Sequence, residues 1–132
     1  MKAMGALLIS LALSACSTGD ASSTIDYGTV EVPVGRLSSD DARGRGRTLF
    51  RKRCALCHGE RADGHGARRE GLSGKPINFH NKEWRANVTP LRVFEVLSEG
   101  KRGTSMPAWP TLSTEQKWDV TAYVLSVAED GP

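Results

Sequence analysis

The segment from residue 53 to residue 59 reads Arg53-Cys54-Ala55-Leu56-Cys57-His58-Gly59. Its two cysteines are separated by two residues and followed at once by a histidine, which is the spacing of a covalent haem attachment site. Each thiol can form a thioether to one vinyl group of a porphyrin, and the turn between them then directs the imidazole toward the iron. The segment therefore predicts one covalent haem c, held by Cys54 and Cys57, with His58 as an axial ligand.

Two other interpretations of the cysteine pair are open to this spacing. A C-x-x-C pair occurs in disulfide redox motifs and as half of a zinc site. A redox motif does not need the histidine that follows, and a zinc site needs a second pair of ligands that this sequence lacks. Haem attachment is therefore the favoured interpretation.

The size and charge of the chain narrow the classes of function. With 132 residues the chain has room for one small domain and appended segments. A formal net charge of +3 gives no reason to expect a nucleic-acid partner. A domain of this size has a limited core, so a covalently bound apolar macrocycle would supply much of it.

Residues 1–15 have the pattern of a cleaved leader. Lys2 supplies the positive start, and residues 6–13 are an apolar run that is too short for a permanent membrane span. The run ends in Leu13-Ser14-Ala15-Cys16, which resembles the bacterial lipobox, whose cysteine is lipidated and becomes the first mature residue. An ordinary secretory signal with an incidental Cys16 is the alternative. We expect a lipid anchor at Cys16 on the periplasmic side of a bacterial membrane, inner or outer.

After the leader, we expect a flexible tether over residues 16–37 and a folded domain over residues 38–130. Residues 17–24 are small and polar, as in linkers. The first helix is expected to begin near residues 38–41, which supply a cap and an acidic first turn, and to run toward Cys54. Thr89 and Pro90 are typical of a second helix start. Ser113 and Gln116 have the spacing of a capping box for the last helix.

Gly46 and Phe50 stand four residues apart and share one face of the predicted first helix. Together with the attachment motif they form Gly46-x-x-x-Phe50-x-x-x-Cys54-x-x-Cys57-His58, which closely resembles the class I monohaem cytochromes c. The resemblance covers roughly residues 38–128. It implies an all-α fold in which the N- and C-terminal helices cross and enclose the haem, with one or two short helices between. Val120 and Tyr123 are the expected partners of Gly46 and Phe50.

The second part of the resemblance is the loop Gly103-Thr104-Ser105-Met106-Pro107-Ala108. It resembles the axial-ligand loop of the same family and implies that Met106 is the sixth iron ligand. A thioether is a soft ligand that favours Fe(II). His80 as the sixth ligand, or an open sixth position, are the alternatives.

The family resemblance also implies a hydrogen bond from the proximal histidine to the backbone carbonyl of a proline. Pro76 is the best-placed candidate, since an imidazole ligand needs such an acceptor. The alternative is that Pro76 is a plain loop proline.

The resemblance implies a monomeric one-electron carrier that is not an enzyme. Its expected partners are redox proteins, such as an oxidase, a dehydrogenase or another cytochrome, with no nucleic acid. Two alternative functions are a haem enzyme or gas sensor with an open sixth coordination position, and an electron-relay subunit of a larger oxidoreductase. Among the basic residues, Lys101 and Arg102 near the Met106 loop are the best placed to dock an acidic partner.

Overall fold

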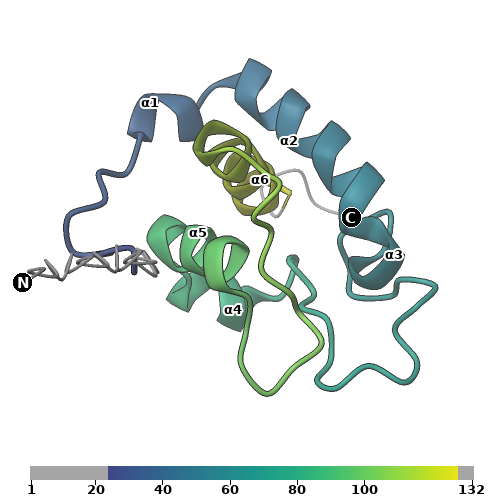
Figure 1. Cartoon of the computed structure of the whole chain (residues 1–132). Helices are drawn as coiled ribbons and strands as arrows, with labels where there is room; N and C mark the ends of the chain where they lie inside the picture. Colours follow the sequence, from purple (N-terminus) through teal and green to yellow (C-terminus); the bar gives the residue numbers. More distant parts are fainter. Residues whose placement is uncertain (1–23, 128–132) are drawn as a thin grey trace, which may run out of the picture.

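The computed structural model describes residues 24–127, and all the elements in this range are helices (Figure 1). They are α1 (Val34–Leu37), α2 (Asp40–Arg53), α3 (Ala55–His58), α4 (Lys82–Asn87), α5 (Pro90–Glu99) and α6 (Thr114–Ser126). The expected leader and Cys16 lie outside the described residues. None of the helices in this range is long and apolar enough to cross a membrane.

The helix starts follow the capping signals of the sequence. Ser39 caps α2 by accepting a hydrogen bond from the backbone N–H of Ala42. Thr89 caps α5 in the same way, with Pro90 in the first helical turn. Ser113 and Gln116 form the predicted capping box at the start of α6. Local polar groups thus set where the three longest helices begin.

The centre of the fold is the crossing of α2 and α6, which lie side by side in Figure 1. Gly46 packs against the backbone carbonyl of Asp119 and against Tyr123. One turn later the rings of Phe50 and Tyr123 lie 5.1 Å apart between centroids. The predicted crossing of N- and C-terminal helices is confirmed. Val120 lies in the same buried core cluster as Phe50, as expected for a partner of the Gly46 and Phe50 face.

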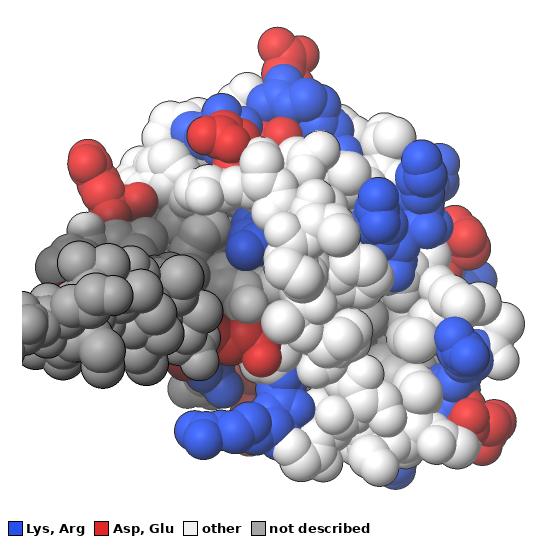
Figure 2. All heavy atoms as spheres, viewed as in Figure 1, with Lys and Arg blue, Asp and Glu red and all other residues white. Residues whose placement is uncertain are grey.

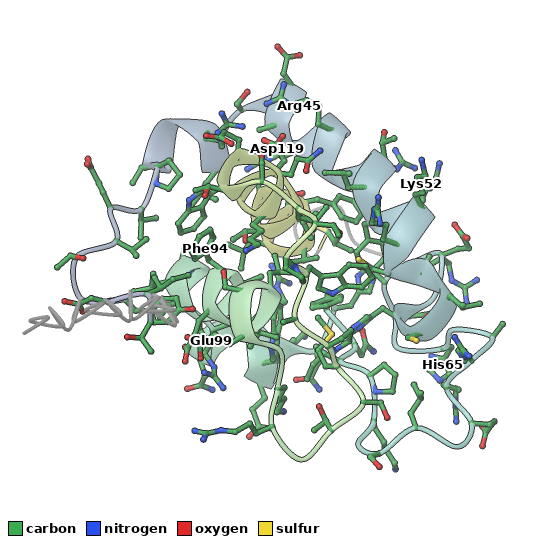
Figure 3. All side chains as sticks on the ribbon, in the orientation of Figure 1. Arg45, Lys52, His65, Phe94, Glu99 and Asp119 are labelled. Atoms are coloured by element: carbon green, nitrogen blue, oxygen red, sulfur yellow. The ribbon has the colours of Figure 1, made fainter. Side chains whose placement is uncertain are left out.

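The prediction of a tether over residues 16–37 is wrong for its last part. Residues 34–37 form α1, which packs against α6. Arg36 donates to the carboxylate of Asp119 at 2.7 Å, and Arg45 of α2 donates to the same carboxylate at 2.8 Å. Figure 3 shows Arg45 directed toward Asp119. An arginine paired with a buried carboxylate holds this segment on the domain, which therefore begins before residue 38.

The remaining helices complete one wall of the molecule. α5 lies against α6, and the rings of Phe94 and Trp118 stack there with centroids 4.3 Å apart. A long loop from Gly59 to residue 81 leads from α3 to α4, and a second loop from Gly100 to Ser113 leads from α5 to α6. Both loops run along the lower side of the view in Figure 1.

Candidate haem site

The attachment motif forms the end of α2 and the short helix α3. Three backbone N–H groups of the following loop cover the carbonyls of this helix: Gly64 donates to His58, Gly66 to Cys57 and Arg68 to Leu56, at 2.8–3.2 Å. A Cβ atom on Gly66 would overlap the backbone of Cys57. The glycine-rich loop therefore satisfies the carbonyls at the end of α3 and holds the motif rigid.

Cys54 and Cys57 form no disulfide. Burial raises the pKa of the Cys54 thiol to about 11, so at neutral pH this group carries its proton. A thioether forms when a thiol adds across a vinyl double bond, with the sulfur bonding to one carbon and the hydrogen to the other. Two reduced thiols in one cavity wall are the groups that this addition requires.

His58 is held by a neighbouring loop. Its Nδ1 atom lies 3.3 Å from the carbonyl oxygen of Ile77. Only the tautomer with a proton on Nδ1 can donate to a carbonyl, and that tautomer leaves Nε2 free to bind a metal. Burial lowers the pKa of His58, which favours the neutral ring that a metal needs.

The backbone carbonyl that faces His58 Nδ1 thus belongs to Ile77. The expectation that Pro76 supplies this carbonyl is wrong by one residue. The carbonyl oxygen of Pro76 instead lies close to Gly64, where a Cβ atom would come within 2.9 Å of it. The ring of His58 also packs on Phe79, with centroids 5.0 Å apart. A backbone contact and an aromatic ring together fix the orientation of the imidazole.

The loop that carries Met106 is closed by its own hydrogen bonds. The backbone N–H of Lys101 donates to the carbonyl of Met106 at 3.0 Å, and the N–H of Met106 donates to Thr104 Oγ1 at 3.2 Å. Gly100, with a φ of +76°, lies against Met106, Pro107 and Ala108 and leaves no room for a Cβ atom. Met106 is therefore placed by a compact loop of defined shape.

Two serines join the loop after α3 to the Met106 loop. The N–H of Ser105 donates to the carbonyl of Ser73, and the N–H of Ser73 donates to Ser105 Oγ, both at 2.9 Å. We call this pair the serine bridge. Sequence reasoning missed it, because neither serine belongs to a motif and their contact depends on the paths of two loops.

Cys54, Cys57, His58 and Met106 all line one cavity of about 310 Å³, so the structure brings the predicted haem-binding residues together. Most of its wall is apolar, formed by Phe50, Leu72, Pro76, Ile77, Phe79, Trp84, Val88, Val93, Val96, Leu97, Trp109, Val120 and Val124. A wall of this kind with two thiols, an imidazole and a thioether fits a covalently bound haem.

The other two histidines are placed differently. His80 does not line the cavity, and its Nε2 atom lies 2.7 Å from the carbonyl of Arg61. His65 lies on the outer loop, with its backbone N–H bonded to the Asp63 carboxylate (Figure 3). Over residues 24–127 there is no group of three or more His, Cys, Asp or Glu side chains that could hold another metal ion.

Comparison with known sequences now identifies the chain. Residues 41–124 match the family described as "Cytochrome C oxidase, cbb3-type, subunit III". The chain belongs to this family. It is a monohaem cytochrome c domain with the class I fold, and its cofactor is a covalently bound haem c. No curated protein sequence matches this cytochrome.

A solved structure with the same fold comes from Kuenenia stuttgartiensis and is titled a reducing HAO-like protein complex. The TM-score is 0.64 at 23% identity, over 79% of this cytochrome and 49% of that chain. At this identity the similarity shows the fold alone. The cytochrome spans about half the length of the chain that it matches.

Proposed function

We propose that this cytochrome is a one-electron carrier in which His58 and Met106 are the two axial ligands of the haem iron. The observation that carries the proposal is that both side chains line the cavity that contains the thiols of Cys54 and Cys57. The bound haem supplies an Fe(III)/Fe(II) couple. The surrounding residues hold the side chains of His58 and Met106 in place and exclude water. The iron ligands therefore move little when an electron arrives or leaves.

The ligand assignment of Met106 is supported by the way its loop is built. The loop is closed by the bond from Lys101 to Met106 and tied to the opposite loop by the serine bridge. Retention of a thioether on iron requires such restraint, because a thioether is a weak ligand that competes with water and small molecules. The alternative sixth ligand, His80, is occupied by the carbonyl of Arg61.

The test of this ligation is the absorption spectrum of the haem-loaded protein, ferric and ferrous, with and without carbon monoxide. We expect a sulfur-to-iron charge-transfer band in the ferric wild type and no carbon monoxide binding to the ferrous form. Met106→Ala should remove the band and admit carbon monoxide, whereas the control His80→Ala should change neither. Carbon monoxide binding by the wild type would refute the assignment and support a haem enzyme or gas sensor.

We also propose that the cytochrome is lipid-anchored through Cys16 on the periplasmic side of a bacterial membrane and exchanges electrons with redox proteins. The lipobox-like residues Leu13-Ser14-Ala15-Cys16 support the anchor. The solved structure with the same fold is titled a protein complex, which supports a role beside other redox proteins. Cys16→Ala should move the protein from the membrane fraction to the soluble periplasmic fraction. Retention of that variant in the membrane would contradict a lipid anchor.

A further inference from the structure

We propose that Lys75 and Lys101 form the carboxylate-binding side of the haem site and hold the two haem propionates. The proposal rests on haem binding in the cavity as proposed above, but it does not require Met106 to be an iron ligand. Both lysines then bind the cofactor. The sequence alone had favoured a different role for Lys101, the docking of an acidic partner protein.

The first step is the charge along the cavity wall. Arg53, Lys75, Arg92 and Lys101 line the cavity, and among the described residues no acidic side chain does. Arg92 is already paired with Glu95 at 2.7 Å. No ion pair within residues 24–127 involves Arg53, Lys75 or Lys101. Three cations without an ion-pair partner among the described residues, on a mostly apolar wall, favour an anionic ligand.

The second step is the position of the two lysines relative to each other. Lys75 follows Ser73 by two residues, and the backbone of Lys101 is bonded to Met106, the neighbour of Ser105. The serine bridge therefore brings the segments that carry both lysines to the same end of the cavity. Like charges gathered at one end repel one another, and carboxylates placed between them remove this repulsion.

The third step uses the chemistry of the haem. Its vinyl groups and its propionates lie on opposite edges of the macrocycle, so the thioether bonds fix where the propionates project. A haem attached through Cys54 and Cys57 would have its vinyl edge beside α3, and Arg53, next to Cys54, would lie at that edge. The two loops joined by the serine bridge run below the helices in Figure 1, away from α2. Lys75 and Lys101 are therefore the cations on the propionate side.

The surface view fits this division of roles. Where grey atoms do not cover the surface, Figure 2 shows basic side chains in several separate groups, some beside acidic ones, with uncharged surface between the groups. Cations that serve the cofactor need to be few and local, whereas a docking field would be broad. This leaves Arg53 and Arg102 as the nearby cations that are not assigned to the haem.

The experiment compares Lys75→Gln, Lys101→Gln and the double variant with Arg102→Gln, a matched control that removes the next charge along the chain but does not line the cavity. The readouts are the propionate bending bands in resonance Raman spectra, the propionate methylene signals in proton NMR spectra, and the reduction potential. We expect each lysine variant to shift the propionate signals. The equilibrium constant for reduction should fall about threefold to tenfold per charge removed, because a lost cation favours Fe(III). Arg102→Gln and Arg53→Gln should leave the propionate signals unchanged.

Unchanged propionate signals in the double variant would overturn the proposal. Equal shifts in Arg102→Gln and Lys101→Gln would also overturn it, since the effect would then be one of general surface charge. The sulfur-to-iron charge-transfer band is recorded on the same samples. Its absence from the wild type would refute Met106 ligation while leaving the propionate comparison valid, so the two failures are distinguishable.

Discussion

Gly46 on α2 lies directly against the backbone carbonyl of Asp119 on α6, with no room for a side chain between them. This contact sets how closely the two main helices approach. The ring of Phe50, one turn further along α2, reaches both Tyr123 and the ring of His58, at centroid distances of 5.1 and 6.2 Å. The helix crossing and the haem ligand are therefore linked through one aromatic side chain.

Gly46→Ala is expected to destabilise the protein by about 1–3 kcal/mol, because the added Cβ atom would force the two helices apart. Gly44→Ala is the matched control on the same helix, since nothing lies within 4 Å of its Cβ position. That control should leave stability unchanged or raise it by about 1 kcal/mol through better helix propensity. Chemical denaturation of both haem-loaded variants measures the difference, and equal stabilities would contradict the close contact.

Asp119→Asn is expected to cost about 1–3 kcal/mol, since it removes a buried carboxylate that pairs with Arg36 and Arg45. Asp40→Asn, whose side chain is fully exposed, is the control and should have little effect. Chemical denaturation at neutral pH measures the free energy of unfolding of both variants against the wild type.

The same carboxylate predicts part of the response of the protein to acid. Burial raises the pKa of Asp119, but hydrogen bonds from Arg45 and Arg36 outweigh this and leave the pKa below its usual value. The unfolded chain therefore takes up this proton first as the pH falls. The stabilisation is complete above the usual aspartate pKa of about 4 and is lost as the pH falls through the lower folded value. Stability measured from pH 7 to pH 3 should fall less steeply in Asp119→Asn than in the wild type.

Gly66→Ala should reduce covalent haem attachment, because a Cβ atom at this position would overlap the backbone of Cys57 and displace the motif. Gly35→Ala is the control, since its Cβ position is open. The fraction of protein that carries haem, measured by haem absorbance per polypeptide, should fall at least severalfold for Gly66→Ala alone. A normal haem content would show that the loop does not hold the motif.

Ser105→Ala removes the Ser105 Oγ acceptor of the serine bridge and leaves the backbone bond to Ser73 in place. Under the proposed ligation Met106 should then leave the iron more readily, so the affinity of ferric iron for added imidazole should rise about threefold to tenfold. Ser98→Ala also removes one side-chain acceptor, that of Lys117, but on α5. An equal change in both variants would mean that the serine bridge does not restrain Met106.

Short-range patterns in the sequence predicted several parts of the structure correctly. The cap at Ser39 was placed to within a residue, and the capping box of Ser113 and Gln116 was predicted outright. Each depends on groups within one helical turn, so the residues alone determine the outcome. The sequence also predicted that Gly46 and Phe50 lie on one face of the helix, because helical periodicity fixes which residues point the same way.

The sequence alone determined that Cys54, Cys57 and His58 form one covalent haem motif, because their spacing is a property of five consecutive residues. Only the tertiary structure decided that Ile77, and not Pro76, accepts the bond from His58, since turning a loop by one residue exchanges which carbonyl faces inward. It also decided the ion pair of Arg36 with Asp119, 83 residues apart, and the serine bridge, 32 residues apart. Such contacts depend on where whole segments come to rest after the core has packed, and no local pattern encodes that position.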